Sequence, residues 1–529
     1  MFTTVGVWCA RCWGMREGST TSPAIKSNLI FVQNGITGMI AQRGAHRHKA
    51  TNTLASSSSD SSVSPQLGPN ERISRISGYK DNSIDRNSTI LGIRDDRSLF
   101  ATNSVAKRAT SPLPSQPQLF ALYHRIPHSP PGQSNAFLNS PSFNDYVLSH
   151  CDRMMEYSYF KPIKNQMVQV RHLILSRLNA STFTRWIMFL CARVCESFVK
   201  GDTSQNQIYS QWTEDVEHAL RSVLTRDLES HEAQDRLCDW LEIILLRTML
   251  VHTSRTYTVL KNATPAFLQL VFSDPTLWPA NYDLTSIPLT SALASPRHEL
   301  AYFALLDSVC AMAFGLPQQV EYDTSLERLP PNSNPHEWLH SSPAEFQITL
   351  AEINACRDKS STARNWREIE HSLLTWQPRS GKPDPSWESW MAVAWLAVQE
   401  SWRHTLLAYL YMIVCKAVCN VASDDPRVQS SVRQIFRVIG TVKKQESSDA
   451  NVPFFIQHLI AGICARSEKH RKSAREQLAN VSETRLWLMR GVDFVPVLDH
   501  LWHGAAVNGR PIKWSDYMRS REIMLPVVM

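Results

Sequence analysis

Two cysteines near the N-terminus have a spacing that is used for metal binding. Cys9 and Cys12 form a Cys-x-x-Cys pair, and two thiolates at this spacing can bind one tetrahedral zinc ion. A complete site needs two further ligands, and the next cysteine in the sequence is Cys151. We therefore favour a fortuitous pair, and we expect no cofactor in this chain unless further cysteines complete a zinc site.

Two histidines near the C-terminus are the other candidate metal ligands. His500 and His503 are three residues apart, so on a helix their imidazoles share one face. A zinc hydrolase would also need a third ligand and a carboxylate as general base, as in a His-Glu-x-x-His pattern, which is absent here. We expect hydrogen-bonded histidines near a helix end at Gly504. A buried enzyme site that uses Asp499, His500 and His503 is the less favoured alternative.

Other common catalytic signatures are also absent from the sequence. It contains no Gly-x-Ser-x-Gly elbow, no phosphate-binding loop that ends in Lys-Ser or Lys-Thr, and no dinucleotide-binding fingerprint. Each of these motifs is a local requirement of a common enzyme class. We therefore predict no catalytic residues and no enzyme activity.

Basic residues are unevenly distributed along the chain. The first 140 residues hold 15 Lys and Arg against 7 Asp and Glu, and the remaining residues hold 40 against 41. An N-terminal excess would suit contact with nucleic acid, but the charges are scattered. The one dense basic run in the rest of the chain is expected to be a solvated face. The alternative is a contact patch for an acidic partner or a phosphate, formed by Arg466, Lys469, Arg471, Lys472 and Arg475.

The elements that position these residues begin after a long polar segment. Residues 51–140 are rich in Ser, Asn and Pro and poor in aromatic residues. Such a composition buries too little apolar surface to offset the entropy of the chain. We predict an atypical N-terminus at 1–50, a disordered linker at 51–140 and a folded body at 141–529.

Apolar side chains recur at helical spacing throughout the body, and strand-like alternation is hard to find. Ser181 is a plausible N-cap, and Asp425 with Pro426 forms a strong helix start. We predict an all-α fold, a large irregular multi-helix domain preceded by a disordered region. The expected helices cover 163–178, 183–198, 208–220, 237–250, a short helix from Pro265, 296–314, 346–353, 366–374, 387–399, 403–420, a helix from Pro426, 454–467, 470–480 and a last segment from Leu486.

Cysteine usage and hydropathy indicate the environment of the protein. The 11 cysteines are mostly in apolar stretches, which is typical of buried, reduced thiols in an intracellular protein. The most apolar segment, 405–422, contains Lys416 and is shorter than the roughly 20 apolar residues that a membrane-spanning helix needs. We expect a soluble protein without a membrane partner.

Several segments of the body resemble one protein family. They are ESWRHTLLAYLY at 400–411, SDDPRVQ at 423–429, IAGICARSEKHRK at 460–472 and DFVPVLDHLW at 493–502. These segments are similar to the regulatory region of proteins with a fungal-specific transcription factor domain, and the similarity extends from about residue 142 to the C-terminus. The resemblance implies a helical domain that regulates transcription in the nucleus, with transcription machinery or co-regulators as partners.

In this family the regulatory domain is typically linked to a binuclear zinc cluster, in which six cysteines hold two zinc ions and an adjacent basic run reads DNA. Here only Cys9 and Cys12 precede the linker. Either the sequence begins downstream of an exon with the other cysteines, which we prefer because the linker is present, or the protein lacks the cluster. We predict a zinc-cluster type regulator whose own DNA-binding cluster is missing or truncated. The alternative is a cytoplasmic helical scaffold for protein–protein interactions.

Overall fold

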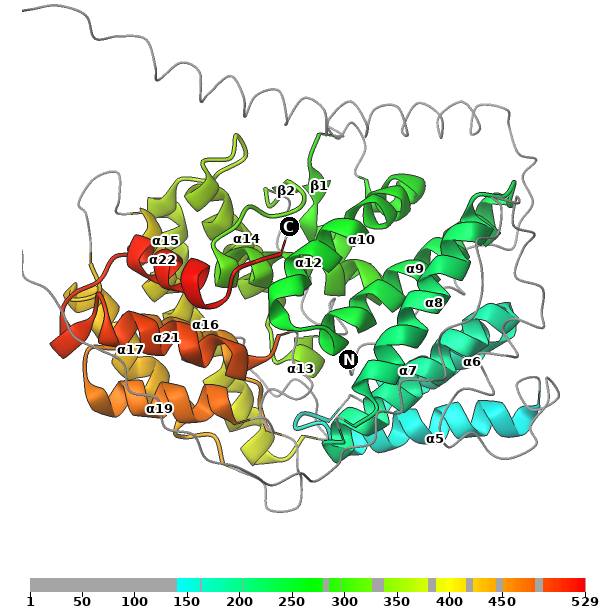
Figure 1. The fold of residues 1–529 in the computed structure, drawn as a ribbon, viewed down its shortest axis with the longest axis horizontal. Helices are drawn as coiled ribbons and strands as arrows, with labels where there is room; N and C mark the ends of the chain where they lie inside the picture. The colour runs from blue at the N-terminus through cyan, green and yellow to red at the C-terminus, as the bar shows by residue number, and fades with distance from the viewer. Residues whose placement is uncertain are drawn as a thin grey trace, which may run out of the picture. The chain divides into compact units, whose positions relative to one another are not determined.

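The computed structural model describes residues 140–161, 164–202, 204–278, 285–295, 297–325, 337–378, 387–414, 422–443, 451–480 and 489–528. These residues belong to one unit of the chain and are almost entirely helical (Figure 1). The prediction of an all-α body is confirmed. The N-terminus at 1–50 and the linker up to residue 139 lie outside the described residues.

The first half of the described chain is a series of long helices packed on their neighbours. Helix α5 packs on α7, α8 on α9, and α9 on α10. The predicted cap is present, because the Ser181 hydroxyl accepts a hydrogen bond from the backbone N–H of Thr184. The elements are α5 (Pro141–Tyr157), α6 (Lys164–Ala180), α7 (Thr182–Lys200), α8 (Asn206–Leu224), α9 (Ser230–Leu250), α10 (Thr253–Ser273) and the 3₁₀ turn η1 (Pro275–Leu277).

The second half contains shorter helices around one very long helix. Helix α16 packs on α14, α15, α17 and α18, and α21 packs on α22. The elements are α11 (Leu289–Ala294), α12 (His298–Phe314), α13 (Glu337–His340), α14 (Ala344–Asp358), α15 (Trp366–Thr375), α16 (Ser389–Val414), α17 (Pro426–Ile439), α18 (Phe455–Cys464), α19 (Glu468–Ala479), α21 (Val495–His503) and α22 (Trp514–Met524), with 3₁₀ turns η2 (Gly491–Phe494) and η3 (Val507–Gly509).

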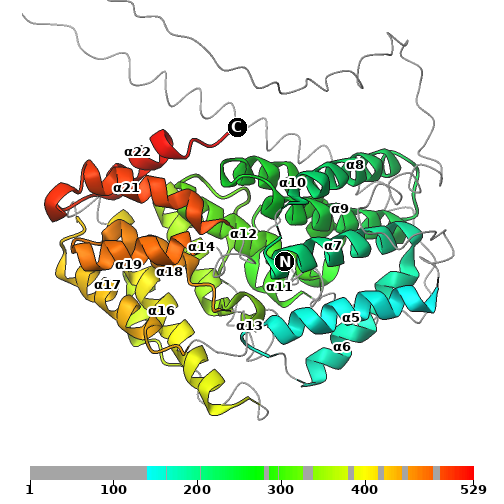
Figure 2. The ribbon, with the colours of Figure 1, turned by 60° about the horizontal axis from the view of Figure 1, so that its bottom comes forward.

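Helix α12 is the centre of the described unit. All of its residues are buried, as expected for a helix whose apolar residues are spread around its whole circumference. Figures 1 and 2 place it between the earlier helices α9 and α10 and the later helix α14, and it contacts all three. The ring of Phe303 on α12 stacks on Phe267 of α10 with centroids 4.1 Å apart. The two halves of the described chain therefore share one core.

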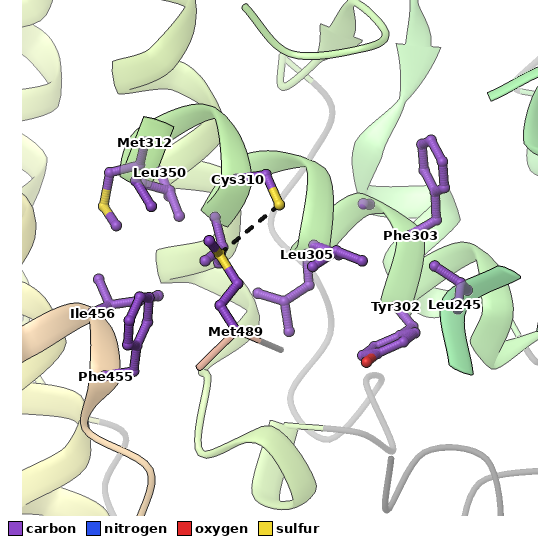
Figure 3. Packing of buried hydrophobic residues seen from close by; sticks show 14 of the residues in the cluster. Leu245, Tyr302, Phe303, Leu305, Cys310, Met312, Leu350, Phe455, Ile456 and Met489 are labelled. Atoms are coloured by element: carbon purple, nitrogen blue, oxygen red, sulfur yellow. Dashed lines mark hydrogen bonds between the residues drawn. The ribbon is translucent and has the colours of Figure 1, made fainter. Parts of the chain in front are cut away.

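Side chains from distant parts of the sequence meet around α12. Figure 3 shows Cys310 of α12 facing Met489, with the two sulfur atoms 3.9 Å apart. Leu350 of α14 and Phe455 of α18 belong to the same buried cluster. Six of the cysteines are buried in this way, as predicted: Cys151, Cys191, Cys195, Cys238, Cys310 and Cys464.

A two-stranded sheet joins the segment just before α11 to the segment that follows α12. Strand β1 (Ile287–Pro288) pairs in parallel with β2 (Tyr322–Asp323). The β2 end of this connection is also tied to the core, because the buried Asp307 carboxylate of α12 accepts hydrogen bonds from the Gln319 backbone N–H at 2.8 Å and from the Tyr322 hydroxyl at 3.1 Å.

The prediction that a short helix begins at Pro265 is wrong. Pro265 lies inside α10, which runs without a break from Thr253 to Ser273. An internal proline costs about 3 kcal/mol because it removes one backbone hydrogen bond and its ring crowds the preceding turn. Here Leu260 and Phe267, on either side of the proline, are fully buried, and this burial outweighs the local cost.

The predicted break between helices at 387–399 and 403–420 is also absent. Helix α16 continues through it, and its described part ends at Val414. Glu400 stabilises the continuous turn, because its carboxylate accepts hydrogen bonds from Arg403 at 2.8 Å and pairs with His404 at 3.1 Å. In the part of the chain that the structure describes, no helix combines the length and apolarity needed to cross a bilayer.

Candidate functional site

The basic run singled out in the sequence lies at the junction of α18 and α19. The Ser467 hydroxyl caps α19 by accepting from the backbone N–H of His470. Arg466 precedes this cap, and the side chains of Lys469 and Lys472 are exposed on the helix. The run therefore presents two lysines to solvent, whereas its arginines have specific partners.

Arg471 is a structural residue of this junction. Its side chain is buried, and its guanidinium donates to the carbonyl oxygens of Ala465 at 3.2 Å and Ala506 at 2.6 Å. It also pairs with Glu468 at 2.9 Å. These contacts hold the residues after α18 and after α21 against α19. The Arg471 side chain is therefore held in one position at this junction.

Arg475 faces α21, the helix that lies beside α19 in both ribbon views. Its guanidinium pairs with the Asp499 carboxylate. Its central carbon lies 6.0 Å from the centre of the Trp502 ring, and that of Arg471 lies 5.9 Å from the same ring. The Trp502 indole N–H donates to the Gly462 carbonyl oxygen at 3.0 Å, which fixes the ring in place.

A pocket of about 440 Å³ opens between these elements. Its size falls within the range of small-molecule sites in proteins. It contains three cationic side chains and one carboxylate. The pocket is lined by Glu468, Arg471, Lys472 and Arg475 of α19, by Trp502 and His503 of α21, and by Val507 and Asn508 of η3.

The turn η3 closes one side of the pocket in a tight conformation. Asn508 and Gly509 both have left-handed backbone angles, with φ of 56° and 71°. Asparagine and glycine tolerate this region better than other residues. A Cβ atom at Gly509 would lie 2.9 Å from the Arg466 carbonyl oxygen, and the Arg466 guanidinium donates to the Gly509 carbonyl oxygen at 2.9 Å. The turn is thereby fastened to the start of α19.

The two histidines considered as metal ligands are engaged separately. His500 Nδ1 lies 3.1 Å from the Ser520 hydroxyl of α22, and His503 Nδ1 lies 2.8 Å from the Asp499 carbonyl oxygen. Helix α21 ends at His503 with Gly504 as its C-cap, as predicted. Among the described residues, no group of three or more His, Cys, Asp or Glu side chains could hold a metal ion. Cys9 and Cys12 lie outside the described residues.

Sequence reasoning missed a buried charged cluster around Arg177 of α6. Its guanidinium bonds Asp239 at 2.7 Å and Glu299 at 2.6 Å, and it pairs with Glu242 at 3.2 Å. Asp239 also pairs with Arg236 at 3.1 Å. Asp239 and Glu242 are three residues apart within the apolar stretch 237–246 of α9, which is the one local signal that could have indicated this cluster.

Burial and neighbouring charges shift the pKa values of the groups in and beside this cluster. Burial raises the pKa of Glu242 well above its usual value, although Arg177 opposes the shift. Burial also lowers the pKa of His298, next to Glu299, to about 4. The pKa of Glu299 is below its usual range, because His298 and Arg177 together outweigh the effect of burial. Burial and neighbouring charges therefore shift the pKa values of Glu242 and Glu299 in opposite directions.

A scan against protein-family models identifies the second half of the chain. Residues 289–526 match the model described as the fungal specific transcription factor domain. This part of the chain is therefore similar to fungal-specific transcription factor domains. No curated protein and no solved structure matches the chain.

The residues that line the basic pocket all lie within the matched residues 289–526, whereas only part of the Arg177 cluster does. Glu299 belongs to the matched residues, and Arg177, Asp239 and Glu242 precede them. The match begins at Leu289, so the predicted boundary near residue 141 stays a prediction.

Proposed function

We propose that this protein is a transcription regulator of the fungal zinc-cluster type that acts through its helical domain. The observation that carries the proposal is the family match over residues 289–526. The all-helical body supports it, since a regulatory domain of this kind is helical in the resemblance drawn from the sequence. Regulation through such a domain takes place in the nucleus, with transcription machinery or co-regulators as partners.

In this proposal the helical domain carries out regulation, and a separate component recognises DNA. A binuclear zinc cluster needs six thiolates, and the sequence before residue 150 holds two, Cys9 and Cys12. Zinc would be a cofactor only where further cysteines complete this cluster. The contact with DNA then comes either from such a completed cluster or from a partner protein.

A tethering experiment tests the regulatory step separately from DNA recognition. The whole chain is fused to an unrelated DNA-binding module, and transcription is measured from a reporter that carries the operator of that module. We expect reporter output to rise or fall several-fold relative to the module alone. The same fusion on a reporter without the operator is the control and should have no effect.

A nuclear fusion whose reporter output equals that of the module alone would contradict the proposal. A cytoplasmic location of the untethered protein, combined with that result, would favour a helical scaffold for protein–protein interactions instead.

A further inference from the structure

The pocket between α19, α21 and η3 has the features of a built site rather than a gap between helices. Trp502 is held by its hydrogen bond to the Gly462 carbonyl oxygen, and Arg471 is held by the carbonyl oxygens of Ala465 and Ala506. The turn at Asn508 is fastened through Gly509. Its walls are therefore fixed before any ligand arrives, which lowers the entropy cost of binding.

Two cations of this pocket are exposed to solvent in part. The Lys472 side chain is 78% exposed and pairs with Glu476 at 3.9 Å. The Arg475 side chain is 45% exposed and is paired with Asp499. Arg471, by contrast, is committed to the fold. The pocket thus combines a Trp502 ring held by a hydrogen bond with two cationic side chains that are partly exposed.

The ion pair between Arg475 and Asp499 indicates which ligand groups the pocket can bind. A guanidinium and a carboxylate form directional, charge-assisted hydrogen bonds, and phosphate oxygens can replace the carboxylate in the same geometry. Asp499 of α21, which pairs with the pocket-lining Arg475, already supplies one carboxylate to this guanidinium. A ligand anion would compete with the Asp499 carboxylate for the Arg475 guanidinium.

We propose that this pocket binds a small molecule that carries carboxylate or phosphate groups. Arg475 and Lys472 pair with the anion, and Trp502 packs against the remainder of the ligand. Asp499 competes for Arg475 and so weakens binding in the free protein. The inference concerns binding alone and does not depend on the proposed role in transcription.

Calorimetric titration of the whole protein with citrate and with inorganic phosphate tests the proposal, at an ionic strength kept constant with chloride. We expect saturable binding of at least one of these anions. Arg475→Gln should weaken the affinity about tenfold, as expected for the loss of one charge-assisted hydrogen bond. Lys472→Gln should weaken it in the same direction.

Two further variants separate a specific site from a general effect of charge. Asp499→Asn removes the internal competitor and should strengthen binding several-fold, a change that a damaged fold would not produce. Lys469→Gln is the matched control, because Lys469 is an exposed lysine of the same helix that does not line the pocket. It should leave the affinity unchanged.

Three results would overturn the proposal. The first is the absence of saturable binding of either anion. The second is an equal loss of affinity in Lys469→Gln and Arg475→Gln, which would indicate general attraction to a basic surface. The third is binding of an acidic or phosphorylated peptide without binding of citrate or phosphate, which would make this a protein-docking surface.

Discussion

At the scale of single residues, His458 of α18 occupies an unfavourable position. It is buried beside Phe436 and Phe454, and neither of its ring nitrogens has a hydrogen-bond partner among the described residues. A buried polar group without a partner costs about 1–3 kcal/mol. We expect His458→Leu to raise the free energy of unfolding by that amount in urea titrations. His218→Leu, at an exposed position of α8, should change it by less than about 0.5 kcal/mol.

The same residue makes stability depend on pH. Burial lowers the pKa of His458 to about 4, whereas an unfolded histidine has a pKa near 6.5. Between these values the unfolded chain binds the proton and the folded chain does not, so the wild-type protein loses stability as the pH falls through this window. The stability advantage of His458→Leu should therefore grow by roughly 3 kcal/mol between pH 7 and pH 4. An advantage that stays constant with pH would contradict this assignment.

Gly462 of α18 is required by the close approach of α21. A Cβ atom at this position would lie 2.9 Å from Leu498 Cδ1 and 3.2 Å from the Ala474 Cβ. Overpacking of this kind costs about 1–3 kcal/mol, which exceeds the gain in helix propensity from Gly to Ala of at most about 1 kcal/mol. We expect Gly462→Ala to lower the midpoint of thermal unfolding.

The clash at Gly462 can be separated from other effects by a double variant. Leu498→Ala removes the nearest atom and should itself be destabilising because it leaves a cavity. In that background Gly462→Ala should be neutral or stabilising, so the two changes are not additive. Additive effects in this cycle would mean that the contact with Leu498 is not the cause.

At the scale of helices, the cluster around Arg177 joins α6 to α9 and α12. Replacing Arg177 with alanine would leave the carboxylates of Asp239 and Glu299 buried without their main cation. Loss of one partner from a buried ion pair costs about 3–5 kcal/mol. We expect Arg177→Ala to lower the free energy of unfolding by that amount, measured by urea denaturation.

A matched control for Arg177 lies on the same helix. Arg171 pairs with Asp152 at 3.2 Å, but both side chains are substantially exposed. Exposed pairs contribute at most about 1 kcal/mol, so Arg171→Ala should have little effect. Equal losses from the two variants would contradict a special role for the buried cluster.

Local signals in the sequence predicted helix ends better than helix continuity. Ser181 caps α7, and Asp425 with Pro426 begins α17, because a cap needs only the residue and its next few neighbours. Pro265 predicts a helix start by the same local rule, but it lies inside α10. Whether a helix continues through such a residue depends on burial against other helices, which a single sequence does not display.

The sequence predicted only part of the candidate site, because the rest depends on packing between helices that are distant in sequence. The basic run and its place at a helix junction were predicted, but the separation of its residues into buried and exposed was not. Arg471 bonds the carbonyl oxygen of Ala506, 35 residues away in sequence, and Arg475 meets Asp499 of another helix. Contacts of this kind arise from the packing of α19 on α21 and have no local signature.

At the scale of the whole described unit, the family match covers only part of a shared core. Helix α12 lies inside the matched residues, but α9 and α10 pack on it from outside. Residues 289–529 produced alone would expose the surface of α12 that these helices cover, including Phe303. We expect this fragment to aggregate or to lack a cooperative thermal transition in calorimetry, whereas residues 140–529 should unfold cooperatively. A monomeric, cooperatively folded 289–529 fragment would contradict the shared core.

The central claim, that the protein regulates transcription, is tested most directly by its location on chromatin. The untethered, epitope-tagged protein would be crosslinked in its native cells, and the co-precipitated DNA would be sequenced. We predict enrichment at a discrete set of promoters over an untagged control, whether the DNA contact is its own or a partner's. A protein that is present in the nucleus but gives no enrichment over the control would contradict the claim.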